Sequence, residues 1–307
     1  MTQRRAAALL AALLLLLTFA PAAPAQETTL PGMLGAAERA LYGQDQAGSL
    51  LERVARLERD VYGEVQSGPL LVRVQDVYGF LTGAAGSPYS LALQLNVVEY
   101  LVFQRMNVGV PLTRRLDELE RSLVGTPQQA PLAQRIRSLV ELVWPSGELN
   151  VRTVTLPAET LVKIHLLTEI NSRTSRVGQR IRYRVVDDVM VDNRIVIPAG
   201  AEGEGQVTAV QPAGRFGQGG RVEVDWGTVP ALDGTPVVMA VSERAAAQNQ
   251  ELAVAASMAG VVLLGPIGLV GGLFVQGQEH VVPVGTQFYV EVLRETQALG
   301  LSLTPVR

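Results

Sequence analysis

The stretch SLLERVARLERDVYG at residues 49–63 recurs 62 residues later as PLTRRLDELERSLVG at residues 111–125. In each copy a Ser or Pro comes first, apolar residues follow at spacings of three and four, and a Gly comes last. Such spacing places the apolar side chains along one stripe of a helix, and the final Gly suits a left-handed C-cap. The pattern therefore predicts two related helices that end at Gly63 and Gly125.

Weaker copies of this unit surround the two strong ones. Residues 69–74 and 131–136 follow each unit start by twenty residues, and residues 38–43 repeat the end of the unit. We interpret residues 30–146 as a helical repeat domain made of two related helix pairs, with an extra helix at about residues 89–105 between them. Because each unit must bury its apolar stripe against a neighbour, a small bundle or short solenoid is expected.

After Pro145 the sequence changes to a period of two, which is typical of β strands. Four segments alternate apolar and polar residues: 161–166, 180–185, 221–226 and 287–292. A short motif with Pro stands at the head of three strands, at residues 156–160, 197–201 and 282–286, where a missing N–H breaks no ladder bond. Residues 150–297 are therefore predicted to form a β barrel or sandwich, and the fold class is α+β.

One segment of this β domain has a different composition. From Leu252 to Gln278 it holds no charged residue, and Gly265-Pro266 interrupts it, which predicts a hairpin of two short helices at about residues 246–277. Small residues recur at every fourth position, a glycine-zipper spacing that lets helices approach closely. Contact with a membrane or with other subunits would use Gly260, Gly265, Gly268 and Gly272. The other interpretation is a buried hairpin that caps the barrel, and the sequence leaves both open.

The first 25 residues have the pattern of an export signal peptide. Arg4-Arg5 provides positive charge, residues 6–20 are uncharged, and Ala23-Pro24-Ala25 supplies small residues for cleavage before Gln26. The uncharged stretch is too short to span a bilayer comfortably, and an uncleaved N-terminal anchor is the alternative. We therefore expect an exported protein in the periplasm or associated with the outer membrane.

The composition excludes several classes of enzyme. The chain has no cysteine, which removes disulfides, thiolate metal sites and a cysteine nucleophile. Its two histidines, His165 and His280, lie far apart, and the sequence has no nucleophile motif, phosphate-binding loop or metal-ligand spacing. A formal net charge of -3 argues against binding to duplex nucleic acid. We predict a non-enzymatic protein with no cofactor and no bound metal.

Charged residues gather at two places in the β domain. Arg180, Arg182 and Arg184 alternate along one expected strand and therefore share a face of the sheet. They would contact an anionic envelope polymer or lipid headgroups, or else pair with nearby acids on a solvated face. A second group, Asp187, Asp188 and Asp192, would either bind a hard cation or form a solvated turn.

The order of motifs in the β domain resembles that of a known family. It runs from residues 197–201 and 221–226 through Asp233-Gly234 and the apolar hairpin to residues 282–286 and a last strand. This order is similar to the C-terminal domain of the TrbI-like conjugal-transfer proteins of type IV secretion. The resemblance implies a β barrel from which a helical hairpin projects and helps to line a ring-shaped outer-membrane channel. The N-terminal repeats resemble units found in exported proteins of bacteria with two membranes.

Two functions fit these features. The first is a non-enzymatic assembly or structural protein of the cell envelope, whose β domain oligomerises or contacts the outer membrane through the glycine-rich hairpin. Its partners would be further copies of the chain, other envelope proteins or the membrane itself. The second is a soluble periplasmic binding or scaffold module, in which the hairpin belongs to the core.

Overall fold

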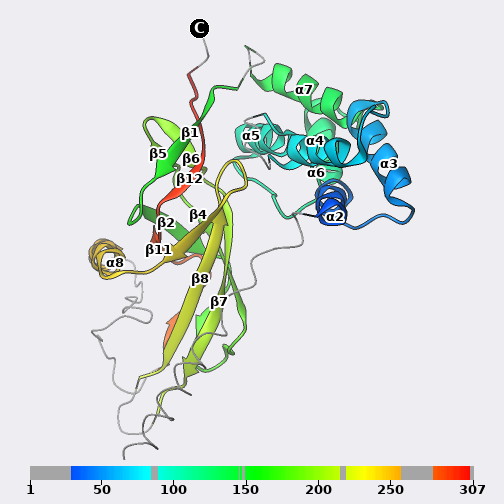
Figure 1. The fold of residues 1–307 in the computed structure, drawn as a ribbon. Helices are drawn as coiled ribbons and strands as arrows, with labels where there is room; N and C mark the ends of the chain where they lie inside the picture. Colours follow the sequence, from blue (N-terminus) through cyan, green and yellow to red (C-terminus); the bar gives the residue numbers. More distant parts are fainter. Residues whose placement is uncertain are drawn as a thin grey trace, which may run out of the picture.

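The computed structural model describes residues 29–83, 89–144, 146, 149–214, 219–256 and 279–304. Within these ranges six helices come first, and a β-rich region with one further helix follows (Figure 1). The fold is α+β, as the sequence predicts, and its β part contains a closed barrel. The first six helices are α2 (Leu30–Tyr42), α3 (Leu50–Tyr62), α4 (Leu70–Thr82), α5 (Leu91–Phe103), α6 (Leu112–Leu123) and α7 (Leu132–Val143).

The helices of the array carry their own start and stop signals. Ser49 begins α3 with a capping box, in which its hydroxyl accepts the N–H of Glu52 and the Glu52 carboxylate accepts the N–H of Ser49. Gly43, Gly63 and Gly83 follow α2, α3 and α4 with φ of 86°, 93° and 82°. Only a residue without a Cβ adopts this left-handed conformation at little cost, so the Gly caps fix where these helices end.

The structure has the two expected helix pairs, α3–α4 and α6–α7, with α5 between them, and because α2 precedes the first pair the six described helices also group as two blocks of three. Successive helices begin 20 or 21 residues apart, so the 62-residue repeat of the sequence spans three helices. The segment expected as an extra helix contains α5, which begins the second block as α2 begins the first. Most of α5 is buried, so its sequence lacks the broad polar face that reveals a helical period. Its correspondence to α2 is therefore not visible in the sequence.

Buried ion pairs join neighbouring helices within each block. A glutamate at the ninth position of one helix binds an arginine at the fourth position of the next, and its carboxylate also accepts the backbone N–H eight residues further on. All four glutamates are at most 1% exposed. The pairs, with nearest N–O distances of 2.5 to 2.7 Å, are Glu38–Arg53, Glu58–Arg73, Glu99–Arg115 and Glu120–Arg135.

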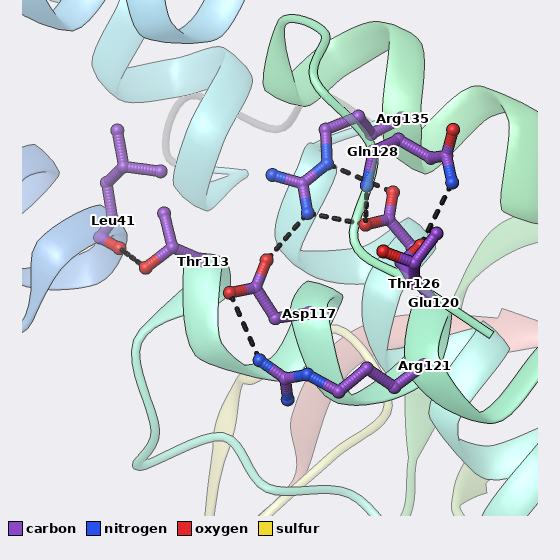
Figure 2. Close-up of polar contacts among 8 residues, drawn as sticks. All are labelled: Leu41, Thr113, Asp117, Glu120, Arg121, Thr126, Gln128 and Arg135. Atoms are coloured by element: carbon purple, nitrogen blue, oxygen red, sulfur yellow. Dashed lines mark hydrogen bonds and ion pairs between the residues drawn. The ribbon is translucent and has the colours of Figure 1, made fainter. Parts of the chain in front are cut away.

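Figure 2 shows the last of these pairs in detail. Arg135 donates to both carboxylate oxygens of Glu120 and also to Asp117, which pairs in turn with Arg121 on the same helix. The N–H of Gln128, in the loop before α7, donates to Glu120 at 2.9 Å. One carboxylate therefore fixes both the loop conformation and the packing of the next helix.

The β region combines a closed six-strand barrel with a four-strand sheet. The barrel order is β11-β2-β4-β7-β8-β9, the sheet order is β1-β12-β6-β5, and β10 pairs with β3. Helix α8 (Glu243–Ala256) lies between β9 and β10 in the chain. The strands are β1 (Val151–Leu156), β2 (Leu161–Leu166), β3 (Ile170–Asn171), β4 (Arg180–Val185), β5 (Val189–Val191), β6 (Arg194–Ile197), β7 (Glu202–Gln211), β8 (Arg221–Pro230), β9 (Pro236–Ala240), β10 (Val281–Val282), β11 (Gln287–Val292) and β12 (Thr296–Leu301).

The barrel strands fill the interior of the barrel with their own side chains. Tyr183, Trp226 and Phe288 pack edge to face, with ring centroids 5.7 and 5.0 Å apart, and none is more than 2% exposed. The hydroxyl of Tyr183 donates to the carbonyl of Trp226 at 2.8 Å. Gly203 makes room for this ring, because a Cβ there would lie 2.2 Å from Cζ of Tyr183. The interior of the barrel is thus closely packed.

Helix α5 joins the array to the β region. The side-chain amide of Asn96 donates to the carbonyl of Leu232 at 2.7 Å, and the hydroxyl of Tyr100 donates to Asp188 at 2.7 Å. Asn96 also accepts a hydrogen bond from Arg115, which connects an ion pair of the array to the barrel turn. One hydrophobic cluster runs through both parts of the molecule. The domain boundaries expected from the sequence, residues 30–146 and 150–297, stay a prediction.

Candidate functional sites

Helix α8 lies at the seam of the barrel. Among the described residues, β9 and β11 pair only at Ala240–Glu291 and Met239–Val292. Beyond that point Asn249 of α8 takes the place of a paired strand, because its amide donates to the Tyr289 carbonyl at 3.0 Å and accepts the Tyr289 N–H at 2.5 Å. The helix therefore lies against the outside of the closed barrel and is fixed to β11 (Figure 1).

Hydrogen bonds fix both ends of the insertion between β9 and β10. At the start, the hydroxyl of Ser242 donates to Glu291 at 2.5 Å, and Ser242 also caps α8. At the end, Glu279 accepts hydrogen bonds from the hydroxyl of Ser172 and the N–H of Ala213. These two bonds, that from Ser172 first, hold the pKa of Glu279 below its ordinary value. Both ends of the insertion are thus attached to the barrel at fixed points.

The expected glycine contacts lie beyond the described part of this insertion. The hairpin predicted at about residues 246–277 begins within α8, which the structure describes through Ala256. Gly260, Gly265, Gly268 and Gly272 lie outside the described residues. Among the residues that are described, no helix is both long and apolar enough to cross a membrane. Contact through the four glycines therefore stays a prediction.

The three alternating arginines lie on the exposed face of β4, where acids of β7 meet them. Arg180 pairs with Glu204 at 3.0 Å, and Arg182 and Arg184 both pair with Glu202 at 2.5 Å. The antiparallel register places Arg182 opposite Glu204 and Arg184 opposite Glu202. The alternation of Glu202 and Glu204 in the sequence is a signal that could have identified these partners. Contact with an anion stays a prediction, and such an anion would compete with two glutamates.

The carboxylate of Glu202 is shared by two arginines of this face. Burial raises its pKa, but the hydrogen bonds from Arg184 and Arg182 outweigh burial, so the pKa of Glu202 lies below its ordinary value. Burial and the neighbouring Arg184 lower the pKa of His165, and Glu202 partly offsets them. The charge of Glu202 therefore partly opposes the effect of Arg184 on His165.

We expect Glu202→Gln to destabilise the protein by about 0.5–1 kcal/mol near neutral pH, because two half-exposed arginines lose their partner. A carboxylate with a lowered pKa stabilises the fold above its unfolded pKa, and this stability is lost as pH falls through its folded pKa. The difference between the wild type and Glu202→Gln should therefore shrink below about pH 4. Urea unfolding from pH 7 to pH 3 measures it. Glu204→Gln, which affects the more exposed pair with Arg180, is the control and should lower the stability less. If the stability difference between the wild type and Glu202→Gln stays constant from pH 7 to pH 3, the ionised Glu202 carboxylate does not stabilise the fold.

The other polar residues singled out in the sequence serve the fold. Asp188, one of the three aspartates considered for a cation, accepts hydrogen bonds from Tyr100 and from the N–H of Ala199, at 2.7 Å each. Asp192 lies in a tight turn with a φ of 50°. His280 is largely buried, which lowers its pKa, and its N–H donates to Ser172. In the described ranges, no group of three or more His, Asp or Glu side chains is arranged to hold a metal ion.

A large cleft separates the helical array from the four-strand sheet. Its volume is about 1030 Å³, and α2, α4, α5 and the loop before α6 line one side of it. The other side is formed by Thr153 of β1, the turn from Asp233 to Thr235, and residues 297–299 of β12. Sequence patterns did not predict this cleft, because its walls come from segments that are far apart along the chain. Its volume is slightly above the roughly 300–1,000 Å³ typical of ligand sites.

The fold and these sites define a class of protein: a single-helix repeat array joined to a closed β barrel, with an insertion whose sequence from Leu252 to Gln278 is uncharged. No protein-family model matches the chain, and no curated protein matches it. One solved structure that it resembles is ComB10 of the Com type IV secretion system of Helicobacter pylori. The match has 14% sequence identity and a TM-score of 0.27, and it covers 46% of this chain and 88% of that chain. The chain is thus weakly similar to a type IV secretion component, at a level from which no function is transferred.

Proposed function

We propose that the chain is a non-enzymatic structural or assembly protein of the cell envelope. In this proposal the barrel self-associates, or contacts the outer membrane, through the insertion at residues 246–277. The observation that best supports this proposal is the uncharged sequence from Leu252 to Gln278. The chain on either side of it is hydrogen-bonded to the β region, at Ser242 before it and at Glu279 after it. The export signal expected in the first 25 residues supports a location in the envelope.

The packing of the barrel supports an external role for the insertion. Tyr183, Trp226 and Phe288 already occupy the interior and contact one another. A cap is therefore not required to fill the barrel, and an apolar segment this long is stabilised when another surface covers it. The alternative, a soluble periplasmic binding or scaffold module with the insertion in its core, needs this segment to pack against its own chain.

The attachment of the insertion supports the same proposal. Asn249 holds α8 against β11, and Glu279 holds the return of the chain to Ser172, directly after β3, and to Ala213, which follows β7. Because both ends are held, a load on the insertion would pass directly into the barrel wall. Such rigid mounting suits a structural element that transmits contacts between subunits or from a membrane surface.

We expect the purified mature protein to sediment as an oligomer, or to require detergent for solubility. Gly268→Leu combined with Gly272→Leu should abolish this association, because larger side chains prevent close approach of helices. Analytical ultracentrifugation with and without detergent measures the change. Ala47→Leu combined with Ser67→Leu also introduces two leucines, at exposed loop positions outside the insertion, and is the control. A wild type that is a stable monomer without detergent would overturn the proposal and favour the soluble module.

A further inference from the structure

Strand β12 presents an edge to the cleft that no described strand covers. β12 pairs with β1 over residues 296–301, whereas its only described pairing with β6 is Leu301 with Ile195. The N–H of Ser302 bonds the carbonyl of Asn150, and in an antiparallel ladder such bonds recur at every second residue. Even-numbered residues of β12 therefore bond β1, and odd-numbered residues point their N–H and C=O groups to the other edge.

The contacts of the odd-numbered residues agree with this alternation. The N–H of Leu299 donates to the carboxylate of Asp233 at 2.8 Å, on the edge away from β1. Gln297 lies two residues earlier, so its N–H and C=O point to the same edge, where it lines the cleft. Asp233 thus occupies one position of an unpaired strand edge, and no residue of the described ranges occupies the position at Gln297.

The charged groups in the walls of the cleft already have partners. Arg39 pairs with Asp45, and the buried Arg115 pairs with Glu99. Asp233 accepts the N–H groups of Thr235 and Leu299. A charged ligand would therefore find no uncommitted counter-ion among the described residues that line the cleft. Uncharged groups of the ligand would instead meet hydroxyls on the sheet side and exposed Val108 and Val110 on the helical side.

We propose that this cleft binds an extended, uncharged segment of a partner polypeptide by strand addition to β12 at Gln297. Strand addition joins main-chain groups of the ligand to an open sheet edge, and the walls of the groove then select its side chains. The cleft supplies both parts, because residues 297–299 of β12 line one side of it and the helical array lines the other. This proposal is independent of any self-association through the insertion.

The test separates the backbone of Gln297 from its side chain. Gln297→Pro removes the N–H that points into the cleft and leaves the bonds between β12 and β1, which use the even-numbered residues. Gln297→Ala keeps the N–H and removes the side-chain amide. Gly109→Trp fills the cleft from the loop before α6, at a position where a Cβ would have no atom within 4 Å. Circular dichroism and thermal melting confirm the fold of each variant.

Binding partners are selected from a phage-displayed library of random heptapeptides on the immobilised mature protein. Enriched peptides should lack charged residues at their centre, bind Gln297→Ala like the wild type, and bind Gly109→Trp at least tenfold more weakly. Binding to Gln297→Pro should be roughly fivefold to tenfold weaker, as expected for one lost hydrogen bond. Equal losses in the Ala and Pro variants would overturn strand addition. If no peptide binds the wild type more tightly than Gly109→Trp, the cleft is not the binding site. This outcome does not require a folded Gln297→Pro variant, so the proposal can be tested even if that variant unfolds.

Discussion

Glu99→Ala is expected to lower the free energy of unfolding by about 3–5 kcal/mol, which is the cost of leaving one member of a buried ion pair without its partner. The side chain of Arg115 is 3% exposed and donates to Glu99 through two nitrogens, so it cannot turn to water when the carboxylate is removed. The backbone N–H of Asn107 loses its acceptor at the same time. Urea denaturation followed by circular dichroism measures the loss.

Glu120→Ala is the matched control for this prediction. It removes the equivalent carboxylate from the next helix, but Arg135 keeps Asp117 at 2.7 Å and its side chain is 12% exposed (Figure 2). The remaining cost is mainly the unpaired N–H of Gln128, which is about 1–3 kcal/mol. Equal losses in the two variants would show that burial of the arginine does not decide the effect.

Gly200→Ala should destabilise the protein by about 2–5 kcal/mol. Its φ of 84° costs a residue with a Cβ about 1–2 kcal/mol. The new methyl group would also lie 2.1 Å from the backbone carbonyl oxygen of Gln104, directly after α5, and overpacking of this kind costs about 1–3 kcal/mol. Because the clash is with backbone of the array, the substitution forces the array and the β region apart. Thermal and urea unfolding measure the effect.

The second Pro-x-Gly turn provides the control for Gly200→Ala. Gly285 has nearly the same φ, 87°, but a Cβ there would meet no atom within 4 Å. Gly285→Ala should therefore cost only the backbone strain of about 1–2 kcal/mol. If the two variants melt together, the contact between Gly200 and Gln104 does not hold the two parts in place.

Local signals in the sequence predicted much of this fold. The Leu and Val spacing of residues 50–61 and the Gly at 63 correctly predicted a helix and its end, because both are local properties of the chain. The change to a period of two predicted the strands after residue 150 in the same way. The grouping of helices was less visible, because α5 has a nearly continuous apolar sequence whose burial on most sides is a property of the whole array.

The candidate sites depend on contacts that local patterns do not contain. Glu202 pairs with two arginines, the nearer of which is 18 residues away in the sequence. Asn249 bonds the backbone of β11, 40 residues away. The cleft needs the relative placement of helices and sheet, which follows from packing over the whole chain. The buried ion pairs were accessible in principle, since a Glu followed 15 or 16 residues later by an Arg recurs four times. The sequence alone does not show that these residues pair, because that follows from their burial between neighbouring helices in the structure.

The places where these ion pairs stop have a consequence for how the array was assembled. At the joint between α4 and α5 the ninth and fourth positions are Tyr78 and Gln94, and the outer ends of the array have Met33 and Val140 in the corresponding positions. A three-helix block can therefore be copied, deleted or exchanged at these joints without separating a buried charge from its partner. A block boundary placed between any other pair of neighbouring helices would leave a buried carboxylate or guanidinium without its partner. Each three-helix block is thus self-contained in its buried charges, and a gene duplication of 62 codons at this joint would produce a longer array in which every buried charge of the described helices is already matched.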